Sequence, residues 1–342
     1  MNISDFDSSV SNWREQLRKN ELRTRGVILA FVLLFLGVGL VVDVSILLSN
    51  YRGVSIGQCL YALMTFHKFP IATVIMVGIA VVSLLITFSM YDTIMLLGTD
   101  SHEITPETAA NLEEKQLYNV VEEMKVAAGL RYMPKVFLIE AEYMNAFASG
   151  YSEKSAMVAI TRGLMQKLTR AEMQAVMAHE LSHVRHHDIK LNLTVAVLSN
   201  ILLIAIDMLF YSAVFGRNDR REDNRFILLI VILRYTLPLV TLFLGLFLSR
   251  TREFMADAGC VELMRDNEPM AKALLKINQD HSEHADEYAR AYGQTAHEQV
   301  RQSSYLFDPS DLNPVKSMSS VFSTHPSIDE RLSAIGFKRR QS

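Results

Sequence analysis

The stretch TRAEMQAVMAHELSHVRHH, residues 169–187, contains a helix start and a group of side chains that can bind a metal. Thr169 and Glu172 form a capping box, which predicts a helix that begins here and runs to about the end of the stretch. His179 and His183 are spaced i and i+4 and therefore share one helix face. The pattern predicts that both imidazoles bind one metal ion.

Glu180 directly follows the first histidine, where its carboxylate can accept a proton from a water molecule and pass it to a leaving amine. Neutral imidazoles suit zinc, which lowers the pKa of bound water to near 7. The predicted chemistry is peptide-bond hydrolysis. The alternative is a chance match, as at His297-Glu298, where Arg301 stands in place of a second histidine.

A catalytic zinc ion needs three protein ligands and one open position. His186 and His187 are not spaced to converge on the same ion, and they are expected at the surface or behind the ligands. Glu253 and Asp257 share a helix face at i and i+4. Glu253 is the candidate third ligand, and Asp257 is the candidate acceptor for the second N–H of a liganding imidazole. A surface pair among neighbouring arginines is the alternative.

Half of the 342 residues are hydrophobic, which is high for a soluble enzyme. Four apolar runs are long enough to cross a bilayer, which takes about 20 residues. They lie at residues 26–49, 70–91, 191–215 and 226–249. Buried core helices are the alternative, mainly for the last two runs, because each carries a charge.

Those charges are Asp207 and Arg234, which lie equally far from the link between the two runs. In an antiparallel hairpin they would sit at the same depth. A charge inside a membrane needs a partner. Asp207 and Arg234 are therefore predicted to face each other or to share a polar cavity.

Basic residues cluster ahead of the first run, which places the N-terminus and the segment after the second run in the cytoplasm. The arginine-rich link at 216–225 conflicts with a simple four-span arrangement, so the second hairpin either spans the membrane or enters it only in part. A cleaved signal peptide is not expected. Cys59 and Cys260 fall on opposite sides of the membrane and are not expected to form a disulfide.

The predicted fold is α+β, a zincin-like core of a small sheet and the His-Glu-x-x-His helix, with about four transmembrane or membrane-embedded helices. Strands are expected at 135–139, 143–148 and 156–160. The predicted organisation is a cytoplasmic N-terminal segment (1–25), a first hairpin (26–97), a first protease part (98–190), a second hairpin (191–249) and a second protease part with the third ligand (250–342).

The motifs as a set resemble the HtpX-type family of membrane zinc metalloproteases, which is related to the CAAX prenyl endoproteases. The resemblance covers residues 20–340. It is carried by the order of apolar runs around His-Glu-x-x-His and Glu-x-x-x-Asp, and by Asn145-Ala-Phe-Ala148, Thr161-Arg-Gly163-Leu164 and Thr324-His-Pro-Ser327 with Arg331.

The resemblance implies one Zn²⁺ per chain, with Glu253 as third ligand. It also implies an edge strand on which an extended substrate pairs, formed by Asn145, Ala146, Phe147 and Ala148. His325 and Arg331 resemble residues that reach into the cleft and stabilise the oxyanion. From its sequence context alone, His325 would be interpreted as a helix-capping or surface histidine, and only the resemblance assigns it a place in the cleft.

The predicted function is ATP-independent endoproteolysis of misfolded or damaged membrane proteins at the bacterial inner membrane, with both termini and the active site in the cytoplasm. A small net charge of −3 and the lack of a Walker motif argue against nucleic-acid and nucleotide partners. The alternatives are a CAAX-type processing protease, and a membrane transporter or scaffold with a vestigial zinc site. The polar stretch 281–320 could be a lid or a substrate filter. Its His281 and His284 could bind a metal, but exposed helix polarity is the expectation.

Overall fold

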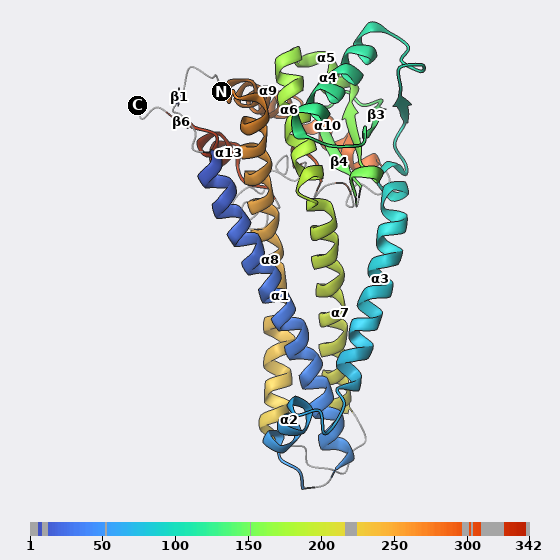
Figure 1. Ribbon diagram of the computed structural model, residues 1–342, viewed down its shortest axis with the longest axis vertical. Helices are drawn as coiled ribbons and strands as arrows, with labels where there is room; N and C mark the ends of the chain where they lie inside the picture. Colours follow the sequence, from blue (N-terminus) through green and yellow to red (C-terminus); the bar gives the residue numbers. More distant parts are fainter. Residues whose placement is uncertain are drawn as a thin grey trace. The chain divides into compact units, whose positions relative to one another are not determined.

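The computed structural model describes residues 6–8, 13–51, 53–150, 152–215, 224–295, 301, 304–308 and 325–339 (Figure 1). The helices are α1 (Trp13–Asn50), α2 (Ile56–Met64), α3 (Ile71–Leu96), α4 (Leu112–Ala128), α5 (Arg162–Lys167), α6 (Arg170–Arg185), α7 (Asp188–Phe215), α8 (Asn224–Met264), α9 (Glu268–Glu283), α10 (Ala285–Gln294) and α13 (Ile328–Ala334). The strands are β1 (Phe6–Ser8), β2 (Ser101–Ile104), β3 (Lys135–Ile139), β4 (Ala146–Ser149), β5 (Met157–Thr161) and β6 (Phe337–Arg339).

The chain divides into two compact units. The first unit contains residues 1–24, 88–191 and 246–342, and the second contains residues 25–87 and 192–245. Helices α1, α3, α7 and α8 each begin in one unit and end in the other.

The first unit is built around a four-stranded sheet in the order β2-β3-β5-β4. The central strands β3 and β5 run parallel, and the outer strands β2 and β4 are antiparallel to them. All five residues of β5 are buried, as expected of a central strand with both faces covered. Outside this sheet, β1 pairs with β6.

Helix α6 packs against α4, β4 and α9. The Thr169 hydroxyl accepts the Glu172 backbone N–H and the Glu172 carboxylate accepts the Thr169 N–H, so the predicted capping box is present. Most of the helix is buried, including both residues of the His179-Glu180 pair. A helix buried on several faces holds its side chains in fixed positions.

The predicted strands lie within a few residues of those observed, at β3, β4 and β5. Strand β2 was not predicted. It is a short edge strand whose burial does not alternate clearly, so its sequence lacks a strand signature.

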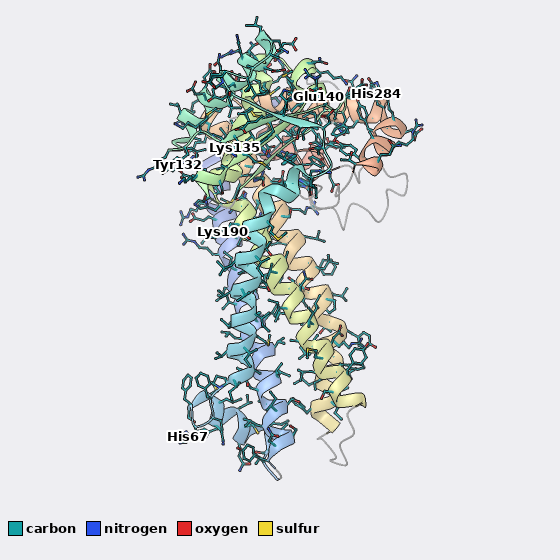
Figure 2. The ribbon with its side chains drawn as sticks, turned by 90° about the vertical axis from the view of Figure 1, so that its right-hand side faces the viewer. His67, Tyr132, Lys135, Glu140, Lys190 and His284 are labelled. Atoms are coloured by element: carbon teal, nitrogen blue, oxygen red, sulfur yellow. The ribbon has the colours of Figure 1, made fainter. Side chains whose placement is uncertain are left out.

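The second unit packs segments of α1, α2, α3, α7 and α8 around an apolar core. Core residues include Phe35, Val44, Leu63, Ala80, Leu202, Ile206, Ile230 and Leu237. Large apolar side chains are also exposed on the outer faces of these helices (Figure 2). An apolar surface of this extent suits contact with lipid.

Three helices within the described ranges are long and apolar enough to cross a membrane: Arg18–Asn50, Lys190–Ala213 and Phe226–Met264. The second predicted run gives a shorter apolar stretch, Ile71–Thr87, within α3. The arginine-rich link lies outside the described residues at 216–223.

Two ionisable sites in the second unit have specific partners. The Asp43 carboxylate accepts the backbone N–H groups of Ala72 (2.8 Å) and Thr73 (3.0 Å) in the first turn of α3. An acidic side chain at a helix N-terminus satisfies N–H groups that lack a partner in the helix. Elsewhere, Nε of Arg234 donates to Oδ1 of Asp207 at 2.7 Å. Each of these charges therefore has a partner within the second unit.

Candidate metal centre

Helix α6 presents His179 and His183 one turn apart, and α8 brings Glu253 to them. The two helices approach closely at Gly259, where an added Cβ would lie 1.9 Å from Oγ and 3.0 Å from Cβ of Ser182. A residue larger than glycine would push α8 away from α6. Gly259 lies six positions along the helix from Glu253, so the close approach also fixes the distance of Glu253 from the histidines.

The three ligand atoms lie at separations that suit one ion. Nε2 of His179 is 3.2 Å from Nε2 of His183. The Glu253 carboxylate oxygens lie 3.6 Å from the first and 3.5 Å from the second of these nitrogens. Tetrahedral zinc with bonds near 2.05 Å separates its ligands by about 3.3 Å. The donor set of two imidazoles and one carboxylate therefore fits zinc in chemistry and in geometry.

Each histidine presents its other ring nitrogen to an aspartate. Nδ1 of His179 lies 3.0 Å from Oδ1 of Asp257, the contact expected from the spacing. Nδ1 of His183 lies 2.8 Å from Oδ2 of Asp188, which also pairs with Arg252. Such carboxylates fix the tautomer and the ring orientation of a liganding histidine.

Asp188 was not singled out by sequence reasoning. It lies five residues after His183, so it is not on the same face of one continuous helix. The chain turns at His187, whose φ of 55° is left-handed, and α7 then begins at Asp188. His186 caps α6, and its carbonyl accepts a hydrogen bond from Arg252 at 2.9 Å. The only sequence signal for this contact was that Asp188 directly follows His186 and His187.

Glu180 is buried beside the two histidines, and no described group makes a hydrogen bond of ordinary geometry to either of its oxygens. The backbone of Ala148 on β4 is near enough to interact with it electrostatically. Burial raises the pKa of the Glu180 carboxyl to about 7. A carboxyl group with unsatisfied oxygens and a pKa near neutrality is suited to exchanging protons with water.

The pKa values of His179 and His183 are shifted in opposite directions. Burial lowers the pKa of the His183 imidazole to about 3, which keeps it in the neutral form that binds metals. Burial also acts to lower the pKa of His179, but hydrogen bonds with Asp257 and Glu253 outweigh it and raise that pKa to about 9. The carboxylates therefore favour positive charge at this position, as a metal cation supplies.

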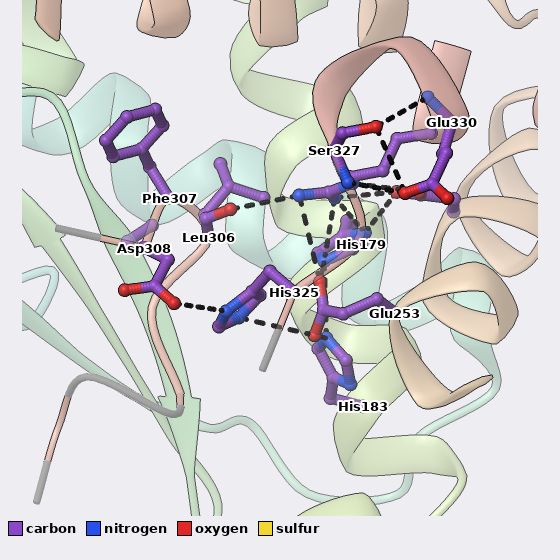
Figure 3. Close-up of polar contacts among 12 residues, drawn as sticks. His179, His183, Glu253, Leu306, Phe307, Asp308, His325, Ser327 and Glu330 are labelled. Carbon is purple, nitrogen blue, oxygen red and sulfur yellow. Dashed lines mark hydrogen bonds and ion pairs between the residues drawn. The ribbon is translucent and has the colours of Figure 1, made fainter. Parts of the chain in front are cut away.

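Arg331 and His325 both reach the centre from the C-terminal part of the chain, and His325 is seen beside Glu253 in Figure 3. Arg331 binds both oxygens of Asp257, at 2.9 and 2.7 Å, and its Nη1 donates to the carbonyl of Leu306 at 2.9 Å. Nε2 of His325 lies 3.8 Å from Oε1 of Glu253. Both predicted residues are thus buried within reach of the candidate ligands.

The predicted substrate edge is partly paired with the chain itself. Strand β4 forms one edge of the sheet, and Phe147 bridges Tyr305 in antiparallel orientation. The backbone N–H of Leu306 donates to the Ala146 carbonyl at 2.9 Å. The side chain of Asn145 binds the backbone of Phe307.

The expectation that His281 lies on an exposed helix face is wrong. His281 is 0% exposed, stacks on Phe307 with ring centroids 3.9 Å apart, and meets the Tyr292 hydroxyl at 3.1 Å. His284 is exposed (Figure 2), and its Nδ1 lies 2.9 Å from the carbonyl of Asp280. The sequence did not indicate this burial, because the rings packed against His281 come from Tyr288 and Tyr292 of α10 and from Phe307, which is distant in the sequence.

Comparison with known proteins places these features in a family. Residues 111–337 match peptidase family M48. The chain is 36% identical over 326 residues to the protease HtpX homolog of Helicobacter acinonychis, covering 95% of this chain and 98% of the relative. It is 31% identical over 332 residues to the homolog of Leuconostoc citreum (94% and 98% covered), and 35% identical over 220 residues to protease HtpX of Legionella pneumophila strain Corby (64% and 75% covered). The crystal structure of S. mikatae Ste24p is similar at 23% identity and a TM-score of 0.47, covering 82% of this chain and 62% of that protein.

Proposed function

Because this chain belongs to peptidase family M48 and is a membrane-associated metalloendopeptidase, we propose that its metal is zinc, held by His179, His183 and Glu253. One observation carries the proposal. The ligand atoms of these three residues all lie within 4.8 Å of one another, and the Glu180 carboxylate is buried beside them with no hydrogen bond of ordinary geometry from the described part of the chain. A buried carboxylate without hydrogen bonds is costly, and a purely structural metal site does not require one.

The reaction assigned to this site is hydrolysis of a peptide bond. Bound zinc would supply Lewis acidity, polarising the scissile carbonyl and making water a stronger nucleophile. Glu180 accepts the proton of the attacking water on one of its oxygens and gives it to the leaving amine. Asp257 and Asp188 hold the imidazole rings of His179 and His183 in place.

We propose that two residues stabilise the negative charge that develops on the carbonyl oxygen. His325 donates from Nε2, which faces the candidate ligands. Arg331 adds its positive charge 3.7 Å from Glu253, and hydrogen bonds to Asp257 and to the Leu306 carbonyl hold its guanidinium in place.

The proposed setting is the cytoplasmic face of a bacterial inner membrane. The cluster of basic residues ahead of the first apolar run supports this orientation. The second hairpin lies between the histidine ligands and Glu253, so both of its ends must reach the same side. The five-segment organisation predicted above provides this arrangement.

The proposed role is quality control of misfolded or damaged membrane proteins without ATP. The chain lacks a Walker motif that would mark an unfolding motor of its own. Its substrates would therefore be segments that are already extended or locally unfolded.

The test is cleavage of casein by the detergent-purified chain, stripped with a chelator and then given zinc, beside a Glu180→Gln variant. Zinc-dependent cleavage by the wild type with a loss of at least about 100-fold in the variant is expected. The variant should bind zinc as the wild type does, because Glu180 is not a ligand. Equal inactivity of both proteins with zinc bound would contradict the proposal.

A further inference from the structure

We propose that helix α2 and the turn that joins it to α3 form a membrane-interface anchor, whose aromatic side chains enter the boundary between lipid headgroups and acyl chains. The anchor comprises residues 55–71 of the second unit. Its partner is the lipid surface itself. This role is separate from the proposed protease activity.

Helix α2 is short and has two different faces. It begins at a capping box, in which the Ser55 hydroxyl accepts the Gln58 N–H and the Gln58 side chain accepts the Ser55 N–H. Cys59 and Leu63 lie one turn apart, and both are buried in the apolar core of the second unit. Because one face is held in this core, the residues on the opposite face must point outward.

The outward side chains of the anchor are large and apolar. Four of them are between 61% and 74% exposed: Tyr61, Met64, Phe66 and Phe69. In a loop surrounded by water, this apolar surface would be unfavourably hydrated. Amphipathic helices that lie in the membrane interface instead bury such a face at the headgroup–acyl boundary.

The backbone at Phe66 adds a second, independent observation. Its φ of 56° is left-handed, a conformation that favours glycine or asparagine after a helix end and carries a steric cost for a bulky residue. The Phe66 side chain gains little packing within the chain in return, since it is mostly exposed. A strained residue whose ring the fold leaves uncovered indicates a partner outside the chain.

Polar groups accompany the aromatic rings in the same turn. Nζ of Lys68 donates to the Tyr51 hydroxyl at 2.7 Å and lies 4.8 Å from the centre of the Tyr51 ring. His67 is exposed (Figure 2), and its Nδ1 lies 2.8 Å from Oγ1 of Thr65. Aromatic bodies beside polar and cationic tips suit an interface that is apolar on one side and wet on the other.

Continuity with the outer face of the second unit favours lipid over a protein partner. The anchor ends at Ile71, the first residue of α3, which is exposed. The next exposed apolar residues of α3 are Val74 and Ile75. The anchor therefore extends the apolar surface that suits contact with lipid.

The experiment uses tryptophan fluorescence of the full-length chain in lipid vesicles. The chain has one tryptophan, Trp13, which is replaced by phenylalanine in every sample. Phe66→Trp is the reporter, and Tyr132→Trp, at an exposed aromatic residue of the first unit, is the control. The vesicles contain lipids brominated on the acyl chains, either close to the headgroup or near the chain end, and acrylamide serves as the water-soluble quencher.

We expect the shallow brominated lipid to quench Phe66→Trp at least about threefold more than Tyr132→Trp, because the anchor lies at the headgroup–acyl boundary. The shallow lipid should also quench Phe66→Trp more than the deep lipid does. Acrylamide should quench Tyr132→Trp more strongly than Phe66→Trp.

Equal lipid quenching of the two variants would place the turn in water and overturn the proposal. So would stronger quenching by the deep lipid, or shielding of Phe66→Trp from both lipid and acrylamide, which would indicate a protein partner or a second copy of the chain. Thermal unfolding identifies a folding defect, and Tyr61→Trp is measured if Phe66→Trp does not fold. Failure of both to fold would also overturn the proposal, since a side chain that faces lipid should accept tryptophan.

Discussion

Glu180, Glu253 and Asp257 are carboxylates buried around two histidines, and Arg331 places a fixed positive charge beside Glu253 and Asp257. Buried like charges repel strongly because little water screens them. One added cation between the histidines and Glu253 would relieve this repulsion. The centre is therefore expected to be more stable with a divalent metal than with its ligands alone.

The aspartates that contact the two histidines should strengthen zinc binding. Asp188→Asn and Asp257→Asn should each weaken zinc binding about 10- to 100-fold, because the amide cannot match the carboxylate as an acceptor for the imidazole N–H. Zinc affinity is measured by competition with a chromophoric chelator. Asp280→Asn, a buried aspartate paired with Lys167, serves as the control and should bind zinc normally.

Equal zinc affinity in Asp188→Asn and the wild type would show that His183 needs no carboxylate to hold its ring. A larger effect of Asp257→Asn than of Asp188→Asn is expected, because Asp257 also binds Arg331 through both oxygens.

Among the elements, the contact of α6 with α8 sets the distance between Glu253 and the histidines. Gly259→Ala should lower both the unfolding temperature and the zinc affinity, since the added Cβ meets Ser182. Overpacking of this kind costs about 1–3 kcal/mol. Thermal unfolding and zinc competition measure the two effects.

A matched pair of variants isolates the cause. Gly245→Ala in the same helix meets nothing within 4 Å and should be neutral or slightly stabilising. The defect of Gly259→Ala should disappear in a Ser182→Gly background, which removes the atoms that the new Cβ would meet. Persistence of the defect there would place its origin elsewhere.

The buried His281 of helix α9 should make the stability of the chain depend on pH. Burial lowers the pKa of His281 to about 4, below its ordinary value of 6.5. The neutral form is therefore favoured in the folded chain, so its contribution to stability is complete above pH 6.5 and is lost as the pH falls toward 4. Its titratable or charged neighbours are Asp280, His284, Lys167, Tyr288 and Tyr292.

The measurement is the unfolding temperature of His281→Gln and the wild type between pH 7 and pH 4.5. The wild type should lose more stability over this interval, with a limit on the order of 3 kcal/mol. His284→Gln is the control, since this residue is exposed, and should follow the wild type. Identical slopes for all three proteins would contradict the prediction.

On the scale of the whole molecule, the proposed orientation can be tested by labelling. Lys68 follows α2, whereas Glu107 lies before α4, and both are exposed. In a chain with Cys59 and Cys260 replaced by alanine, Lys68→Cys should react with an impermeant maleimide in intact cells. Glu107→Cys should react only after permeabilisation, because the proposed orientation places the protease parts in the cytoplasm. Labelling of Glu107→Cys in intact cells would reverse the proposed orientation.

The local features of the centre could be predicted from the amino-acid sequence. The Thr169 capping box, the two histidines one turn apart and the Glu253–Asp257 spacing follow from helix geometry, which acts over about four residues. The apolar runs and strands β3 and β5 could also be predicted. A strand that is buried on both faces consists of consecutive apolar residues, which the sequence shows directly.

Contacts between residues that are distant in the sequence depend on how the elements pack. Asp188 reaches His183 through the left-handed turn at His187, and the side chain of Asn145 binds the backbone of Phe307. The burial of His281 likewise depends on Phe307. Spacing rules cannot predict such contacts, because they depend on how separate elements pack, and packing joins residues that have no fixed separation in the sequence.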